Sequence, residues 1–119
     1  AAAVAEDRTP PAPFFESPQA RAQWLATHGA RLPVRWLPDA AHRTEFLATV
    51  RYEAQRAGLD PHLVLGLIEV ESGFRKYAVS PVGARGYMQV MPFWSRTIGD
   101  GDAAKLFDAR ANLRFGCAI

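Results

Sequence analysis

The sequence contains a single cysteine, Cys117, among its 119 residues. One thiol cannot form an internal disulfide bond, so the fold must be stabilised by its packed core. We expect Cys117 to be a small buried apolar side chain. A bridge to another chain or to further sequence is the alternative.

Long apolar runs and a large excess of one charge are also absent. The longest apolar stretch, residues 63–68, is too short to span a bilayer. The 14 basic and 12 acidic residues leave a net charge of +2, whereas nucleic-acid-binding domains usually carry a clear basic patch. We therefore expect no nucleic-acid partner. The histidines His28, His42 and His62 are not clustered in the sequence, so no metal site or cofactor is predicted.

The first five residues are small, which is typical of the end left by signal-peptide cleavage. This feature favours an exported protein, although the boundary of an expressed fragment would look the same. Both alternatives stay open at this point.

Capping residues and apolar periodicity predict an all-α fold with about five helices and long loops. Ser17-Pro18 and Asp60-Pro61 are typical helix starts, because the first residue caps the helix and proline suits its first turn. The predicted helices cover residues 17–29, 39–58, 61–72, 92–98 and 108–119. The helix over 61–72 is apolar on several sides, so we expect it to be central and buried.

The chain divides into three predicted parts. Residues 1–16 are rich in proline and form an extended lead, which Phe14 and Phe15 are expected to dock on the body. Residues 17–56 form a helical extension, and residues 57–119 form the core. Trp36, in the connector over 30–38, is expected to be a packing anchor.

Glu71 is the strongest candidate for chemistry because of its place in the chain. It lies at the end of the largely apolar helix over 61–72. Apolar surroundings and the negative end of the helix dipole both disfavour a charged carboxylate. We therefore expect Glu71 to hold a proton near neutrality, as a general acid for glycosidic cleavage must.

No second carboxylate forms a pair with Glu71. Glu69 is two residues away on the same helix, so the two side chains point to nearly opposite sides. Asp100, Asp102 and Asp108 lie in turn or cap contexts further along the chain. The usual two-carboxylate arrangement of glycosidases is therefore not predicted.

The segment Glu71-Ser72-Gly73-Phe74, followed by residues 78–92, resembles the soluble lytic transglycosylase family. The resemblance extends over about 57–116 and includes Asn112 and Gly116, which are similar to an Asn-x-x-x-Gly pattern of a later family helix. Tyr87 replaces a commoner leucine. The resemblance implies a lysozyme-like helical domain with groove-lining loops.

The resemblance also implies a role for each residue of the motif. Glu71 would be the single catalytic acid/base, and Ser72 would hydrogen-bond the sugar beside the cleaved bond. The residues that would bind the glycan or shape its groove are Ser72, Gly83, Gly86, Tyr87, Met88 and Gln89. Packing is the alternative for Tyr87 and Met88. Arg75, Lys76 and Arg85 are expected to be solvated, with binding of peptide-stem carboxylates as the alternative.

The implied reaction cleaves peptidoglycan glycan strands between MurNAc and GlcNAc without consuming water, and leaves 1,6-anhydroMurNAc ends. A bacterial protein exported to the periplasm or cell envelope would carry it out. Two alternatives stay open. One is a lysozyme-like hydrolase that uses the same Glu71 with water. The other is a non-catalytic glycan-binding or assembly module, for example within an envelope-spanning complex.

One part of the family pattern is absent. The family continues with an Ala-Tyr-Asn-like motif whose tyrosine lies against the catalytic glutamate, and this sequence has none. Its last predicted helix reaches Ile119 without a stop signal. We therefore expect the C-terminal part of the domain to be missing, with a short form that has an impaired site as the alternative.

Overall fold

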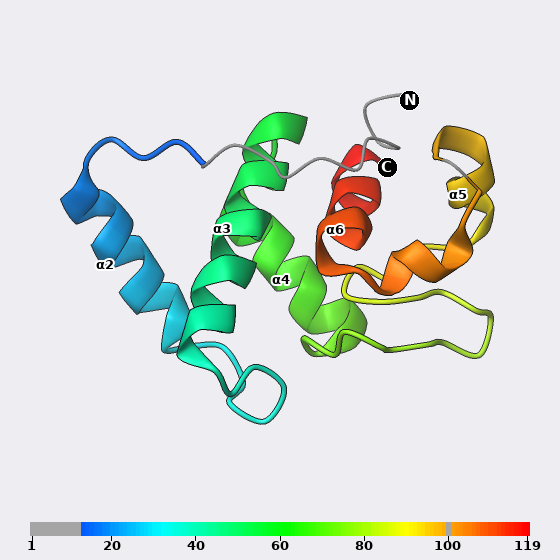
Figure 1. Ribbon diagram of the computed structural model, residues 1–119, viewed down its shortest axis with the longest axis horizontal. Helices are drawn as coiled ribbons and strands as arrows, with labels where there is room; N and C mark the ends of the chain where they lie inside the picture. Colours follow the sequence, from blue (N-terminus) through cyan, green and yellow to red (C-terminus); the bar gives the residue numbers. More distant parts are fainter. Residues whose placement is uncertain (1–12, 100) are drawn as a thin grey trace.

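A computed structural model describes residues 13–99 and 101–119 of the chain. The described part is all-α, as predicted, and its helices are arranged around α3 (Figure 1). The helices are α2 (Pro18–Gly29), α3 (Ala40–Ala57), α4 (Pro61–Ser72), α5 (Phe93–Ile98) and α6 (Ala109–Ala118), with a 3₁₀ helix η1 (Ala103–Phe107) before α6.

The core forms where α3 packs against α2, α4 and α6. Val50 and Ala54 of α3 are completely buried, together with Val64 and Ile68 of α4 and Leu113 of α6. Each of the valine, isoleucine and leucine side chains contributes about 1.5–3 kcal/mol when it is fully removed from water. In Figure 1, α2 lies at one end of the molecule and α5 lies at the other.

The predicted helix boundaries are confirmed, because local capping chemistry sets them. Ser17 accepts a hydrogen bond from the Ala20 N–H at 3.0 Å, and Asp60 accepts one from the His62 N–H at 2.9 Å. Gly58 and Gly73 end α3 and α4 in the left-handed conformation, which glycine adopts without steric cost. The 3₁₀ helix η1 was not predicted, since a short turn of this kind has no apolar periodicity.

The expectation that α4 is buried on several sides is wrong for the described part of the chain. Val64, Ile68 and Ser72 face the core, but Leu63 and Val70 are 54% and 82% exposed. No described element covers this second face of the helix. Only one apolar stripe of α4 therefore has a packing partner among the described residues.

The prediction for Trp36 is wrong, and the prediction for Phe14 and Phe15 holds only for Phe15. Trp36 is 45% exposed and lies against Arg35 rather than in the core. Phe14 is 70% exposed, whereas Phe15 docks on Trp24 with ring centroids 5.8 Å apart. Residues 1–12 of the predicted extended lead lie outside the described residues.

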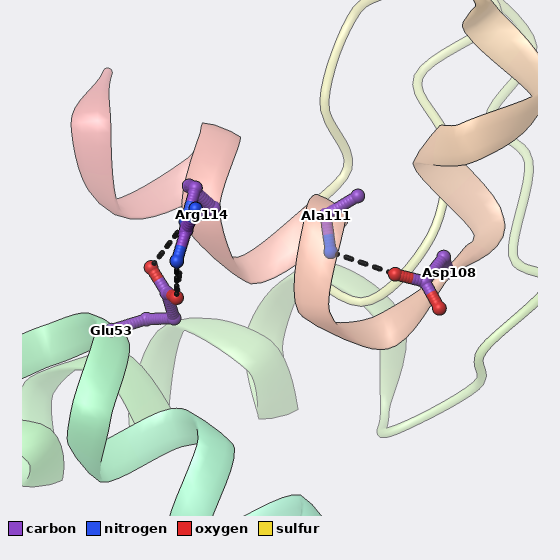
Figure 2. A network of polar contacts seen from close by, with 4 residues as sticks. All are labelled: Glu53, Asp108, Ala111 and Arg114. Carbon is purple, nitrogen blue, oxygen red and sulfur yellow. Dashed lines mark hydrogen bonds and ion pairs between the residues drawn. The ribbon is translucent and has the colours of Figure 1, made fainter. Parts of the chain in front are cut away.

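A buried ion pair joins α3 to α6 and was not predicted. Figure 2 shows Glu53 reaching from α3 to Arg114 on α6, where the Arg114 Nη2 donates to Glu53 Oε1 at 3.0 Å. The side chains are only 2% and 8% exposed, so the two charges are paired with each other away from water. In the same view, Asp108 caps α6 by accepting from the Ala111 N–H at 3.0 Å.

Candidate active site

Glu71 lies in the last turn of α4, where the chain turns sharply away from the helix. Gly73 and Phe74 both have left-handed backbone angles, with φ of 59° and 65°. Glu71 is exposed and makes no hydrogen bond or ion pair with the described residues. The expectation of apolar surroundings for this carboxylate is therefore wrong in the described structure. The negative end of the helix dipole remains beside it.

Ser72 is buried, whereas its neighbour Glu71 is exposed. Ser72 is 2% exposed, and its hydroxyl donates to the Ile68 carbonyl oxygen at 3.1 Å. Its own carbonyl accepts from Arg75 Nε at 2.8 Å, which ties the end of α4 to the following turn. Ser72 is thus placed as a packing residue at the helix end, and the arrangement does not support a direct sugar contact.

The segment over residues 78–90 folds back on itself and forms a compact loop, which we call the motif loop. Arg85 pairs through its backbone with Val79 on one side and with Val90 on the other. The Gly86 N–H donates to the Ala78 carbonyl at 2.8 Å, which closes the base of the loop. The backbone groups of the motif loop are therefore largely satisfied within it, which makes the loop a fixed surface.

Gln89 stabilises the motif loop from within. It has a positive φ of 51°, which is uncommon for a residue with a side chain. Its Nε2 donates to the carbonyl oxygens of Ala78 and Gly86, at 3.1 and 2.9 Å. Within the described part of the chain, the carboxamide oxygen Oε1 is left as the polar atom that Gln89 can offer to a ligand.

The two predicted groove glycines have different surroundings. A Cβ on Gly86 would lie 2.3 Å from Asn112 Nδ2 and 2.6 Å from the Leu106 carbonyl oxygen. A Cβ on Gly83 would meet nothing within 4 Å, although its φ of 91° favours glycine. Gly86 is therefore required for close packing inside the protein, and only Gly83 leaves open space beside its backbone.

Asn112 holds the motif loop to the rest of the fold. Its Nδ2 donates to the carbonyl oxygens of Arg85 and Leu106, each at 2.8 Å. Its Oδ1 accepts from the Met88 backbone N–H at 2.8 Å. One buried carboxamide thus joins the motif loop, η1 and α6, which explains in physical terms why asparagine occurs at this position.

Met88 and Tyr87 both pack inward from the motif loop. A Cβ on Gly116 would lie 2.4 Å from Met88 Sδ, so the glycine makes room for the methionine. Tyr87 is 4% exposed and packs against Phe46, with ring centroids 4.8 Å apart and the rings tilted by 47°. Burial, with a smaller contribution from Tyr77, raises the pKa of Tyr87. Met88 is half-buried, so part of its side chain stays accessible.

A broad groove with a volume of about 1160 Å³ lies between α3, residues 75–79 and the start of α6. Arg75, Lys76 and Arg110 line it together with aromatic side chains. Tyr87 is its only lining residue among the predicted site residues, and Glu71 is not part of its wall. The groove and the Glu71 carboxylate are therefore separate features of the described surface.

The structure thus brings five predicted residues into one loop, Gly83, Gly86, Tyr87, Met88 and Gln89. Glu71 lies at the helix end that leads into this loop, and no hydrogen bond joins it to the loop residues in the described structure. From the sequence, Asn112 was expected only as part of an Asn-x-x-x-Gly pattern with Gly116. Its hydrogen bonds to the motif loop were not predicted, and this pattern on α6 is the sequence feature that marks the residue.

The expectation that the three histidines lie apart is wrong for two of them. His28 Nε2 and His62 Nε2 are 3.1 Å apart, although 34 residues separate them in the sequence. His42 instead lines the broad groove. Among the described residues, no cluster of three or more potential ligands could hold a metal ion.

Comparison with known families gives a match over most of the chain. The model of the transglycosylase SLT domain matches residues 48–119. The match begins inside α3 and includes α4, the motif loop and α6. It therefore contains Glu71 and every residue that was predicted to contact the glycan.

The chain is also similar to curated proteins named membrane-bound lytic murein transglycosylase C. It is 49% identical over 72 residues to the protein of Actinobacillus pleuropneumoniae serotype 5b, a stretch that covers 60% of this chain and 19% of the relative. It is 47% identical over 68 residues to that of Glaesserella parasuis, which covers 56% and 18%. The chain thus spans about a fifth of the length of these relatives.

Each described helix is too short or too polar to span a membrane.

Proposed function

Because the chain belongs to the transglycosylase SLT domain family, we propose that it cleaves the glycan strands of bacterial peptidoglycan, with Glu71 as acid and base. The observation that carries this proposal is the position of Glu71. Its carboxylate is exposed at the end of a packed helix, beside a tight turn that leads into a fixed loop. The relatives are named lytic murein transglycosylases, which agrees with it.

The proposed reaction needs one carboxyl group. Protonated Glu71 donates its proton to the glycosidic oxygen as the bond between MurNAc C1 and that oxygen breaks. The 6-hydroxyl of the same sugar then attacks C1, and its proton passes to the Glu71 carboxylate. This restores the acid and forms a 1,6-anhydroMurNAc end. Because the nucleophile belongs to the substrate, its effective concentration is high and no water is consumed.

The protonation of Glu71 before cleavage is the step that the environment must favour. In the described structure the carboxylate is open to water. A bound glycan strand would displace this water, and loss of water favours the protonated form of a carboxyl group. We therefore propose that the substrate itself completes the acidic site.

Glycan contacts are proposed for the accessible atoms of the motif loop. These are the free Oε1 of Gln89, the accessible part of Met88 and the open backbone at Gly83. Three further residues would support the shape of this surface without touching the glycan, because they are buried: Ser72, Gly86 and Tyr87. Residues 17–56 would brace this core through the packing of α2 on α3.

The proposed place of action is the periplasm or cell envelope, where peptidoglycan lies. The relatives are named membrane-bound proteins, which agrees with an envelope location. The modest positive charge of the chain suits an anionic polymer such as peptidoglycan.

Substitution of Glu71 tests the proposal. We expect Glu71→Gln to lower the rate of fragment release from purified sacculi by about 10²–10⁴-fold, because glutamine cannot donate or accept the proton. Glu69→Gln is the matched control, since Glu69 is exposed on the same helix two residues away. Equal activity of the two variants would overturn the assignment. Binding to sacculi without release by the wild-type protein would instead favour a glycan-binding module.

A further inference from the structure

The rings of His28 and His62 meet at the contact between α2 and the first turn of α4. Their Nε2 atoms are 3.1 Å apart, and their ring centroids are 4.8 Å apart with a tilt of 51°. The two rings therefore incline towards each other rather than lying flat in a stack. His28 is buried, while the His62 side chain is 62% exposed, so the pair is open to solvent on one side.

Asp60 determines which nitrogen of His62 is available. Its Oδ1 lies 3.1 Å from His62 Nδ1 and also accepts from the His62 backbone N–H at 2.9 Å. A carboxylate at this distance holds the proton on Nδ1, which leaves the lone pair of Nε2 directed to His28. This carboxylate–histidine arrangement is the one that orients histidine ligands in metal sites.

The spacing of the two Nε2 atoms suits one metal ion. Two imidazole nitrogens bound at about 2.0–2.1 Å to a tetrahedral ion lie about 3.3 Å from each other. The observed separation of 3.1 Å differs from this value by an amount that small rotations of the rings can supply. In the metal-free protein, the same contact is a hydrogen bond between the two rings.

We propose that His28 and His62 bind a first-row divalent transition-metal ion, with Zn²⁺ as the simplest case, through their two Nε2 atoms. Asp60 orients His62, and water completes the coordination, since the described residues offer no third ligand in the cluster. The bound ion would link α2 to α4, which are otherwise joined through α3. The site is thus a clamp between the helical extension and the core, and it is separate from Glu71.

The charges around the pair indicate a site of modest affinity. Burial, followed by the charges of His62, Arg31 and Arg51, lowers the pKa of His28. The same arginines oppose a cation, and Asp60 offsets part of their effect. Imidazole ligands suit Zn²⁺, Ni²⁺ and Cu²⁺ better than Mg²⁺ or Ca²⁺.

Zn²⁺ titration of the purified chain, followed by calorimetry and thermal unfolding, tests the proposal. We expect one saturable site per chain and a rise in Tm of a few degrees, about the shift that a ligand bound only to the folded state produces. The same titration with Mg²⁺ should give no binding. Absence of saturable Zn²⁺ binding at pH 7.5, a pH at which free histidine is neutral, would overturn the proposal.

Four variants locate the site. His62→Gln, at an exposed position, should lower Zn²⁺ affinity at least tenfold, and His28→Gln should do the same if it remains folded. Asp60→Asn keeps a good helix cap and removes the charge, so we expect a loss of about tenfold. His42→Gln is the matched control and should bind as the wild type does. Equal losses in the His42 and His62 variants would show that the ion binds elsewhere.

Discussion

The side-chain oxygen of Asn112 accepts a hydrogen bond from the backbone N–H of Met88 at 2.8 Å. This contact ties the motif loop to α6 across 24 residues of sequence. The amide nitrogen of the same side chain binds the Arg85 and Leu106 carbonyls, so three segments depend on one buried group. The shape of the motif loop thus depends on a side chain from α6.

Removal of the Asn112 carboxamide should destabilise the fold strongly. We expect Asn112→Ala to lower the free energy of unfolding by about 3 kcal/mol, since it removes three hydrogen bonds and takes the partner of the Met88 N–H and of the Leu106 carbonyl. The Arg85 carbonyl keeps its bond from the Val90 N–H. Asn112→Asp keeps the acceptor for Met88 but loses both donated bonds, so its loss should be of similar size or larger. Urea denaturation measures both variants. Wild-type stability of Asn112→Ala would show that the clamp is dispensable.

Alanine at the two glycines of the motif loop should have unequal effects. Both have positive φ, which costs a residue with a side chain about 1–2 kcal/mol. At Gly86 the new Cβ also collides with Asn112 and Leu106, which adds about 1–3 kcal/mol of overpacking, whereas at Gly83 it meets open space. Thermal unfolding of Gly86→Ala and Gly83→Ala compares them, and equal losses would contradict the close packing at Gly86.

The contribution of the buried Glu53–Arg114 pair to the free energy of unfolding should require both side chains. We expect Glu53→Met or Arg114→Met alone to cost about 3–5 kcal/mol, because each removes one partner of a buried ion pair. The double variant should lose less than either single variant, since no buried charge remains from the pair. A double-mutant cycle by denaturation gives the coupling. Additive losses would show that the pair does not act as a unit.

Cys117 should be unreactive in the folded protein. Burial, with a smaller contribution from Glu53, raises the pKa of its thiol to about 12 from an ordinary value of 9.0. The thiol reagent DTNB should therefore react slowly at pH 8 and rapidly after unfolding, because the thiolate is the nucleophile. Rapid reaction of the native protein would contradict the burial.

The same pKa shift has a consequence for stability at alkaline pH. The folded state favours the neutral thiol, so the full contribution of Cys117 is present below about pH 9 and is lost as the pH rises towards 12. Cys117→Ala should reduce this alkaline loss.

Features that depend on neighbouring residues were predictable from the sequence. Ser17, Asp39, Asp60 and the glycines after α3 and α4 mark helix ends through contacts within a few residues. The place of Glu71 at the end of α4 follows from the same local signals.

Features that depend on distant residues were not predictable in this way. The pairs His28–His62 and Glu53–Arg114 join positions 34 and 61 residues apart. Asn112 likewise acts on a loop that the sequence does not place beside it. The exposed face of α4, with Leu63 and Val70, shows that apolar composition alone does not say which side of a helix is covered.

The mass of the fragments released from purified sacculi tests the central proposal most directly. If Glu71 passes its proton to the glycosidic oxygen and the 6-hydroxyl of the sugar attacks, the new ends are 1,6-anhydroMurNAc and are lighter than reducing ends by one water. We predict that the wild-type protein releases these fragments and that Glu71→Gln does not. Fragments with reducing ends only, or the same anhydro fragments from Glu71→Gln, would contradict the account.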